Sequence, residues 1–166
     1  ELYYRLGQVL LADEQYAKSS SALVKALNKG GINQEKRGDA WLLLGTARFS
    51  GAKPEDCDAR DSARKAFVEA TKYPKSSQRA REWISYIDAI KRTLDAQDRL
   101  EQQQREDERQ DQIQRLKQGE QVCRLKGTDD CSKIAAQRKA LEDAGPVPLR
   151  STCKKAGEPA EDGDSN

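Results

Sequence analysis

Two stretches of this chain carry the same pattern of large and small side chains, and that pattern limits the folds open to it. In the upstream stretch the pattern runs through Tyr3, Leu6, Gly7, Ser19, Leu23 and Ala26. In the downstream stretch the corresponding residues are Trp41, Leu44, Gly45, Ala63, Phe67 and Ala70, followed by Tyr73 and Pro74. Glycine and small residues let two helices approach closely, while large side chains fill the space between them. The pattern therefore predicts two pairs of packed helices within residues 1–74.

This pattern resembles that of the tetratricopeptide repeat (TPR) family, and the cysteines and polar tail of the chain are compatible with the exported bacterial members of that family. In that family each repeat is a pair of helices, A and B, with the Leu-Gly pair in helix A. The second copy here follows the first at a longer spacing than the family period of about 34 residues. It also carries an insertion at residues 50–57, between its two helices. We favour a tolerated surface loop for this insertion over an edge contact tethered through Cys57.

A fifth helix is predicted from Ser76 onward, with Ser76 or Ser77 at its N-cap. Residues 80–87 of this helix repeat the arrangement of residues 38–45, except that Ile87 stands in the position of Gly45. Because the glycine is what admits a packed helix B, its loss indicates that no further pair follows. This fifth helix is therefore expected to close the array.

The composition changes abruptly after Leu94, which suggests four segments. Residues 1–94 are predicted to form the TPR-like repeat domain. Residues 95–118 contain few apolar side chains and no Gly or Pro, so they are predicted to form a solvated helical arm. A cysteine-flanked helix–turn–helix corner is expected over 119–145, and a disordered tail over 146–166. The predicted fold class is thus all-α, with a helical repeat extended into a long arm and a C-terminal helical hairpin.

The chain has four cysteines, Cys57, Cys123, Cys131 and Cys153, and no histidine. None of their spacings is that of a zinc site. An even number of cysteines in a small hydrophilic chain favours disulfides and an oxidising compartment. We favour a bridge between Cys123 and Cys131 across the predicted turn, which leaves Cys57 and Cys153 for each other or for other chains. Four cysteines allow three pairings, and the sequence does not choose among them.

Several classes of function find no support in the sequence. Without histidine the commonest general base is absent, and no glycine loop suited to phosphate is present, so we expect neither an enzyme nor a cofactor. The net charge of +2 gives no general reason to bind nucleic acid. No apolar run reaches the ~18 residues that suggest a membrane span. The chain also lacks methionine, which indicates a processed form or a fragment.

The resemblance to the TPR family implies a groove lined by the inner faces of the A helices, which takes a peptide or a partner helix. Carried over by position, the candidate partner-binding residues are Tyr4, Gln8, Leu11, Leu42, Thr46, Phe49, Ile84, Asp88 and Lys91. The alternative for Leu11, Leu42 and Phe49 is that they pack inside the array.

The predicted function is therefore a non-enzymatic protein–protein interaction scaffold within an envelope or secreted complex. The exported members of the family suggest an extracytoplasmic location, in the bacterial periplasm or cell envelope. The alternative function is a structural assembly subunit. Such a subunit would dock through its helical arm and cysteine-containing C-terminal region, with self-association through the arm as one form of docking.

Overall fold

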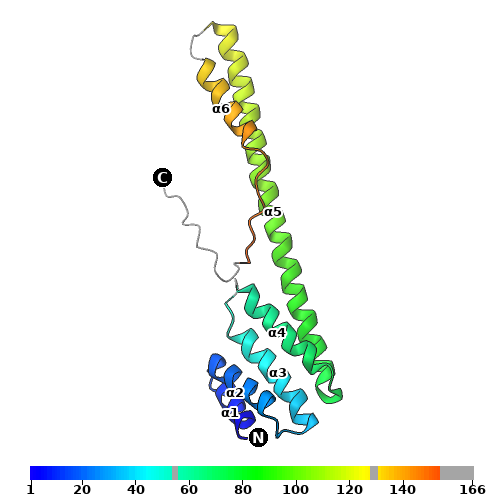
Figure 1. Cartoon of the computed structure of the whole chain (residues 1–166). Coiled ribbons are helices and arrows are strands. Elements are labelled where there is room, and N and C mark those ends of the chain that lie inside the picture. Colours follow the sequence, from blue (N-terminus) through cyan, green and yellow to red (C-terminus); the bar gives the residue numbers. More distant parts are fainter. Residues whose placement is uncertain (54–55, 128–130, 154–166) are drawn as a thin grey trace. The chain divides into compact units, whose positions relative to one another are not determined.

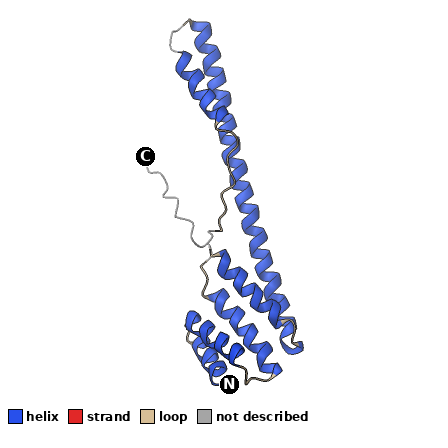
Figure 2. Ribbon diagram, viewed as in Figure 1, coloured by secondary structure: helices blue, strands red, loops and turns tan. Residues whose placement is uncertain are grey.

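The computed structural model describes residues 1–53, 56–127 and 131–153. Within these ranges the regular secondary structure is helical and there is no strand, which confirms the predicted all-α class (Figure 2). The helices, labelled in Figure 1, are α1 (Leu2–Ala12), α2 (Tyr16–Lys29), α3 (Gln34–Ser50), α4 (Cys57–Ala70), α5 (Pro74–Lys126) and α6 (Cys131–Asp143).

The chain divides into two compact units, which are described separately. Among the described residues, the first unit comprises Glu1–Arg92 together with Thr152 and Cys153, and the second comprises Thr93–Ser151. Helix α5 contributes its first part to unit 1 and the remainder to unit 2.

Local chemistry fixes the helix boundaries in unit 1. Helix α2 ends before Gly30, whose φ of 71° suits glycine better than any other residue. Helix α3 is capped by Asn33, whose side chain accepts a hydrogen bond from the backbone N–H of Lys36 at 2.9 Å. Helix α5 starts at Pro74, a residue well suited to a first helical turn. The predicted N-cap at Ser76 or Ser77 is therefore wrong, because both serines lie inside the helix, where Ser76 is buried.

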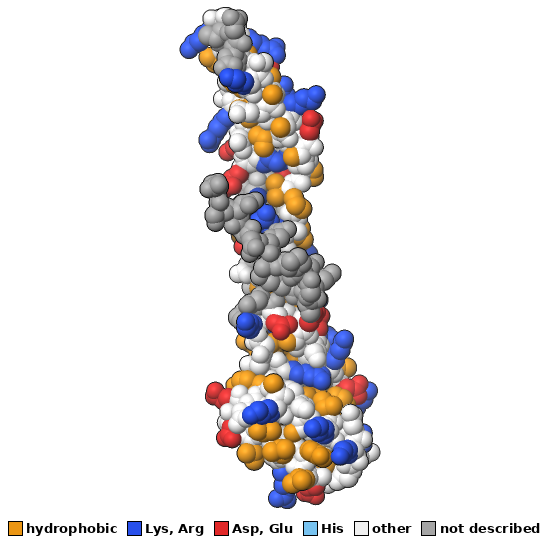
Figure 3. Space-filling model, turned by 60° about the vertical axis from the view of Figure 1, so that its left-hand side comes forward, with side chains coloured by type: hydrophobic (Ala, Val, Ile, Leu, Met, Phe, Trp, Pro, Cys, Tyr) orange, Lys and Arg blue, Asp and Glu red, His pale blue; other side chains and the backbone are white. Residues whose placement is uncertain are grey.

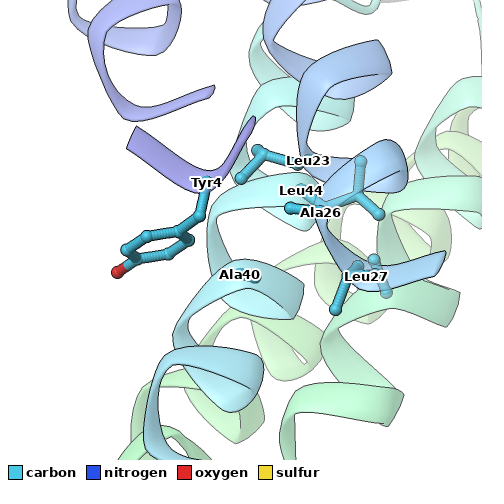
Figure 4. Close-up of a cluster of buried hydrophobic side chains, with 7 residues drawn as sticks. Tyr4, Leu23, Ala26, Leu27, Ala40 and Leu44 are labelled. Atoms are coloured by element: carbon cyan, nitrogen blue, oxygen red, sulfur yellow. The ribbon is translucent and has the colours of Figure 1, made fainter. Parts of the chain in front are cut away.

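Close approach at two glycines holds the helices of unit 1 together. A Cβ atom placed on Gly7 of α1 would lie 2.6 Å from Leu23 of α2. One placed on Gly45 of α3 would lie 2.6 Å from the ring of Phe67 in α4. These are the contacts for which the sequence pattern requires glycine. Around them lies a first core cluster, shown in Figure 4, that includes Tyr4, Leu23, Ala26, Leu27, Ala40 and Leu44.

A second core cluster joins α3 and α4 to the first part of α5. Phe67 is fully buried and stacks on Trp83 of α5, with ring centroids 5.3 Å apart and an angle of 2° between the ring planes. Ala80 and Ile87 of α5 are buried in the same cluster. Ile87, in the position of Gly45, thus serves as a core residue.

In unit 2 the later part of α5 is covered on one side by α6, so the predicted solvated arm is only partly solvated. Ile113 is 3% exposed, and Gly119 of α5 faces Ile134 of α6. The guanidinium of Arg109 donates to the backbone carbonyl of Leu141 at 2.7 Å. Arg138 of α6 donates to the carboxylate of Glu120 at 3.0 Å and lowers the pKa of that carboxyl. Because apolar residues are sparse along this part of α5, charged hydrogen bonds and ion pairs add to the contact between α5 and α6.

The segment after α6 contacts α5, which contradicts a disordered tail beginning at residue 146. The backbone N–H of Val147 donates to Glu106 at 2.9 Å, and its carbonyl accepts from Gln102 at 3.0 Å. Hydrogen bonds from Arg109, Gln110 and the Val147 amide lower the pKa of Glu106 to about 2. The rest of the predicted tail, residues 154–166, lies outside the described residues.

The cysteines form two pairs at disulfide distance. Cys123, near the end of α5, pairs with Cys131 at the start of α6, with Cα atoms 5.7 Å apart. Cys57, at the start of α4, pairs with Cys153 in unit 1, with Cα atoms 5.4 Å apart. The bridge favoured from the sequence is therefore present, and the other two cysteines pair with each other. The turn between α5 and α6 begins at Gly127, and residues 128–130 lie outside the described part.

Candidate partner-binding surface

The predicted groove residues come from three helices of unit 1 that lie side by side. Tyr4 of α1 donates a hydrogen bond to Asp39 of α3. Phe49, at the other end of α3, packs against Trp83 of α5 with ring centroids 5.3 Å apart. Helix α3 therefore lies between α1 and the first part of α5. We call the surface formed by these three helices the three-helix surface.

A polar cavity of about 350 Å³ opens at one end of the three-helix surface. It is lined by Tyr4, Glu35, Lys36, Asp39, Leu42, Lys75, Ser76 and Arg79. Tyr4 and Leu42 are predicted groove residues, and the structure brings them together here. The other six lining residues were not among the predicted set.

Tyr4 is the best-anchored side chain at this cavity. Its hydroxyl donates to Asp39 and accepts a hydrogen bond from the Gln8 amide at 3.0 Å. Burial, followed by the hydrogen bond to Asp39, raises the pKa of Tyr4, so this phenol stays neutral. The Tyr4–Asp39 pair therefore fixes α1 against α3 and presents oriented polar atoms to the cavity.

The rim of the cavity carries both signs of charge. Lys36 contacts the carboxylate of Glu1 and Lys75 contacts that of Glu35, each at 2.6 Å. All four side chains are substantially exposed, so solvent screens both pairs and each contributes little to stability. These side chains can therefore be redirected toward a partner at little cost.

The other end of the three-helix surface is aromatic. Phe49 contacts both Trp83 and Tyr86, with centroid distances of 5.3 and 5.8 Å. Tyr86 is 54% exposed, which is high for a large aromatic side chain. Sequence reasoning missed Tyr86, although its position three residues after Trp83 on the same helix could have indicated it. We call these three residues the aromatic cluster.

Leu42, although it lines the polar cavity, and the remaining predicted residues have structural roles or lie at the margin of the three-helix surface. Leu42 is 5% exposed and belongs to the second core cluster, where Ile84 also packs. The hydroxyl of Thr46 donates to the carbonyl of Leu42 in its own helix at 3.1 Å. Leu11 is half-buried.

Asp88 and Lys91 complete the predicted set. Asp88 accepts two hydrogen bonds from Arg64 of α4, at 2.7 and 3.0 Å, and this contact lowers the pKa of Asp88. Asp88 is thus engaged by α4. Lys91 is exposed.

Residues missed by the sequence prediction lie on α3 and α5, on the N-terminal side of the predicted residues of these helices. Asp39 precedes Leu42 by three positions on α3, and residues 75–79 occupy the first turns of α5. A Cβ atom on Gly38 would lie 2.5 Å from Tyr73, so the start of α5 is packed tightly against α3. The cavity residues begin seven positions before Leu42 on α3 and nine positions before Ile84 on α5, so the predicted set would have had to be extended by two to three turns toward each helix N-terminus to find the cavity.

Comparison with known proteins gives no match. No protein-family model matches the chain. No curated protein and no solved structure shows significant similarity to it. Among the described residues, no cluster of three or more metal-binding side chains occurs, and no helix there is long and apolar enough to cross a membrane. Functional inference therefore depends on the three-helix surface itself.

Proposed function

We propose that unit 1 is a TPR-like, non-enzymatic scaffold that binds a peptide or a partner helix along the three-helix surface. The observation that carries this proposal is the pairing of a polar cavity with the aromatic cluster along one helix. Residues Asp39 and Phe49 mark the two ends on α3. At a rise of 1.5 Å per residue they are about 15 Å apart along the helix axis. That span suits about ten residues of a partner helix or about five of an extended peptide.

The chemistry of the two ends suggests how a partner is held. Exposed aromatic side chains contribute large contact areas and are enriched at protein interfaces. Tyr86 is therefore expected to contact an apolar side chain of the partner. At the cavity, Lys75 and Arg79 offer charge-assisted hydrogen bonds to an acidic or amide group. The partner is thus expected to carry an apolar anchor at one end and a hydrogen-bond acceptor at the other.

Affinity capture with the intact chain, followed by mass spectrometry and direct binding of each candidate, tests this function. Tyr86→Ala removes an exposed ring and should weaken binding at least tenfold (~1.4 kcal/mol) if the ring is an interface hot spot. Leu6→Ala is the matched control, because Leu6 is a large exposed side chain of α1 that is not among the predicted partner-binding residues. A partner that binds wild type and Tyr86→Ala equally well would refute binding at this surface.

The cysteine pairs support a location outside the cytoplasm, and we propose the bacterial periplasm or cell envelope. Disulfides persist in oxidising compartments and are rare in the cytosol. Mass spectrometry of the native protein after alkylation under non-reducing conditions tests this point. Cys57 and Cys153 are expected to remain unalkylated, because a cysteine in a disulfide does not react. Four alkylated cysteines in freshly isolated protein would contradict the proposal.

Assembly through unit 2 is a second candidate function, favoured by apolar exposure near the end of α5. Val122 is 49% and Leu125 87% exposed. A paired substitution, Val122→Ser with Leu125→Ser, should abolish any self-association seen by light scattering. A wild-type chain that stays monomeric at high concentration would count against self-association.

A further inference from the structure

A second cavity opens on a different face of α3, and it shares no lining residue with the polar cavity. Its volume is about 580 Å³, within the range of small-molecule sites. It is lined by Val24, Leu27 and Asn28 of α2, by Trp41, Leu44 and Arg48 of α3, and by Arg64, Lys65, Ala66, Val68 and Glu69 of α4. All of these residues belong to unit 1. We call this the α2–α4 cavity.

Apolar side chains form most of the wall of this cavity. Val24 and Trp41 are half-buried, and Val68 is exposed, so their side chains remain partly open to solvent. Leu27 and Leu44 form its buried base and belong to the first core cluster. On one face of the molecule, hydrophobic side chains reach the surface among lysines and arginines (Figure 3). An apolar molecule would therefore gain free energy by displacing water from this wall.

Positive charges outnumber negative ones around the cavity, three to one, and one cation and the single acid are already paired. Arg64 is paired with Asp88 at 2.7 Å, and Glu69 with Lys72 at 2.7 Å. Lys65 is exposed. The remaining charged residue of the lining is Arg48.

Arg48 is half-buried and lacks an acidic partner. Its Nη1 donates to the carbonyl of Ser62 at 3.2 Å, and within the described part of the chain it pairs with no carboxylate. Burial lowers the pKa of Arg48, although an arginine remains charged at neutral pH. A guanidinium has five N–H donors in a planar fork. Most of these donors are available to a planar, two-oxygen acceptor.

We propose that the α2–α4 cavity binds a small amphipathic carboxylic acid, with its apolar body on the Val24–Trp41–Val68 wall and its carboxylate on Arg48. Charge complementarity selects an anion, because two cations of the lining, Arg48 and Lys65, have no ion pair with an acidic side chain in the described part of the chain, and Arg48 is the half-buried one. The planar fork selects a carboxylate, which accepts two parallel hydrogen bonds. The site is separate from the three-helix surface, so its existence does not depend on the proposed scaffold function.

Binding of octanoate to the intact chain tests the proposal, with the indole N–H signal of Trp41 as an NMR reporter. Titration should shift this signal and leave that of Trp83, which is stacked on Phe67 outside the cavity, largely unmoved. Octylamine tests the need for negative charge and acetate the need for an apolar body. Each should bind at least about tenfold more weakly than octanoate. Octylamine lacks the carboxylate that accepts hydrogen bonds from the charged guanidinium, and acetate lacks the apolar body whose burial favours binding.

Two substitutions separate the role of Arg48 from an effect on folding. Arg48→Gln should weaken octanoate binding about tenfold or more. Arg37→Gln is the matched control, because Arg37 also lies on α3 and donates to a helix carbonyl, that of Leu27, but does not line the cavity. It should leave the affinity unchanged. Val68→Trp should fill the cavity and abolish binding while Arg48 remains in place.

Several results would overturn the proposal. Equal binding of octanoate and octylamine would show that Arg48 does not select the ligand. Unchanged affinity in a folded Arg48→Gln variant, or in Val68→Trp, would exclude the site. Binding of a protein C-terminus at the cavity in the absence of octanoate binding would assign it to a different class of ligand.

Discussion

Replacing Gly45 by alanine sets a gain in helix propensity against a loss in packing. In an exposed helix the substitution stabilises by about 1 kcal/mol. Here the new Cβ would lie 2.6 Å from Cε1 of Phe67, well inside the ~3.5–4.0 Å of a favourable carbon contact. The Phe67 ring is fully buried and stacked on Trp83, so it has no space into which to move. Overpacking of this kind costs about 1–3 kcal/mol. Taking the upper value for an immobilised ring, we expect a net loss of about 2 kcal/mol.

Urea unfolding followed by tryptophan fluorescence measures this effect, since both tryptophans, Trp41 and Trp83, lie in unit 1. Gly119→Ala is the matched control, followed by circular dichroism. This glycine is also inside a helix, but its Cβ would lie 3.9 Å from Ile134, an ordinary contact. The control should be as stable as wild type or up to about 1 kcal/mol more stable. A Gly45→Ala variant as stable as wild type would refute the idea that close approach of α3 and α4 requires glycine.

Three further predictions concern the disulfides, Glu106 and Tyr4. Replacing Cys57 and Cys153 by serine should lower the free energy of unfolding by up to about 4.7 kcal/mol, because that bridge spans 96 positions. Replacing Cys123 and Cys131, which are 8 positions apart, should lower it by about 2.5 kcal/mol. Equal losses in chemical unfolding would contradict the chain-entropy argument. The pKa of Glu106 is lowered to about 2, so its contribution to stability is present above pH 4.5 and is lost as the pH falls toward 2. In an NMR titration the Val147 amide should follow this low midpoint, and a midpoint near 4.5 would show that the contact is absent. Tyr4→Phe should destabilise unit 1 by about 1 kcal/mol in urea unfolding, since Asp39 loses its hydrogen-bond donor. Tyr86→Phe is the control, and because Tyr86 is exposed it should change stability by less than about 0.5 kcal/mol. Similar losses in both variants would exclude a specific role for the Tyr4 hydroxyl.

The parts of the fold that could be predicted depend on local sequence signals. The break between α1 and α2, the end of α2 at Gly30 and the end of α5 before Gly127 all follow from residues within one turn of each boundary. The contacts of Gly7 and Gly45 were predictable because a glycine leaves space for a large side chain on the facing helix. The bridge across the turn after α5 was accessible for the same reason, since its cysteines are near neighbours in sequence.

The parts that could not be predicted depend on polar contacts between residues far apart in sequence. Glu106 and Arg109 lie in a stretch whose composition is that of a solvated helix, and nothing near them indicates Val147 or Leu141 as partners. Hydrophobic periodicity carries no information about such contacts. At the candidate site, Tyr4 and Leu42 could be predicted from their positions in the repeat pattern. The ion pair between Asp88 and Arg64 could not, because it depends on how α4 packs against α5.

The bridge between Cys57 and Cys153 also determines how the chain bears mechanical load. A force applied to the two ends of the described chain passes through this bond and bypasses everything between the two cysteines, including all of α5 and α6. Helices α1 to α3, which precede Cys57, would therefore extend first. Reduction of the bond would release 96 further positions, which correspond to about 330 Å of contour length at roughly 3.4 Å per residue. The disulfide thus carries the load in place of the enclosed chain for as long as the compartment keeps it oxidised.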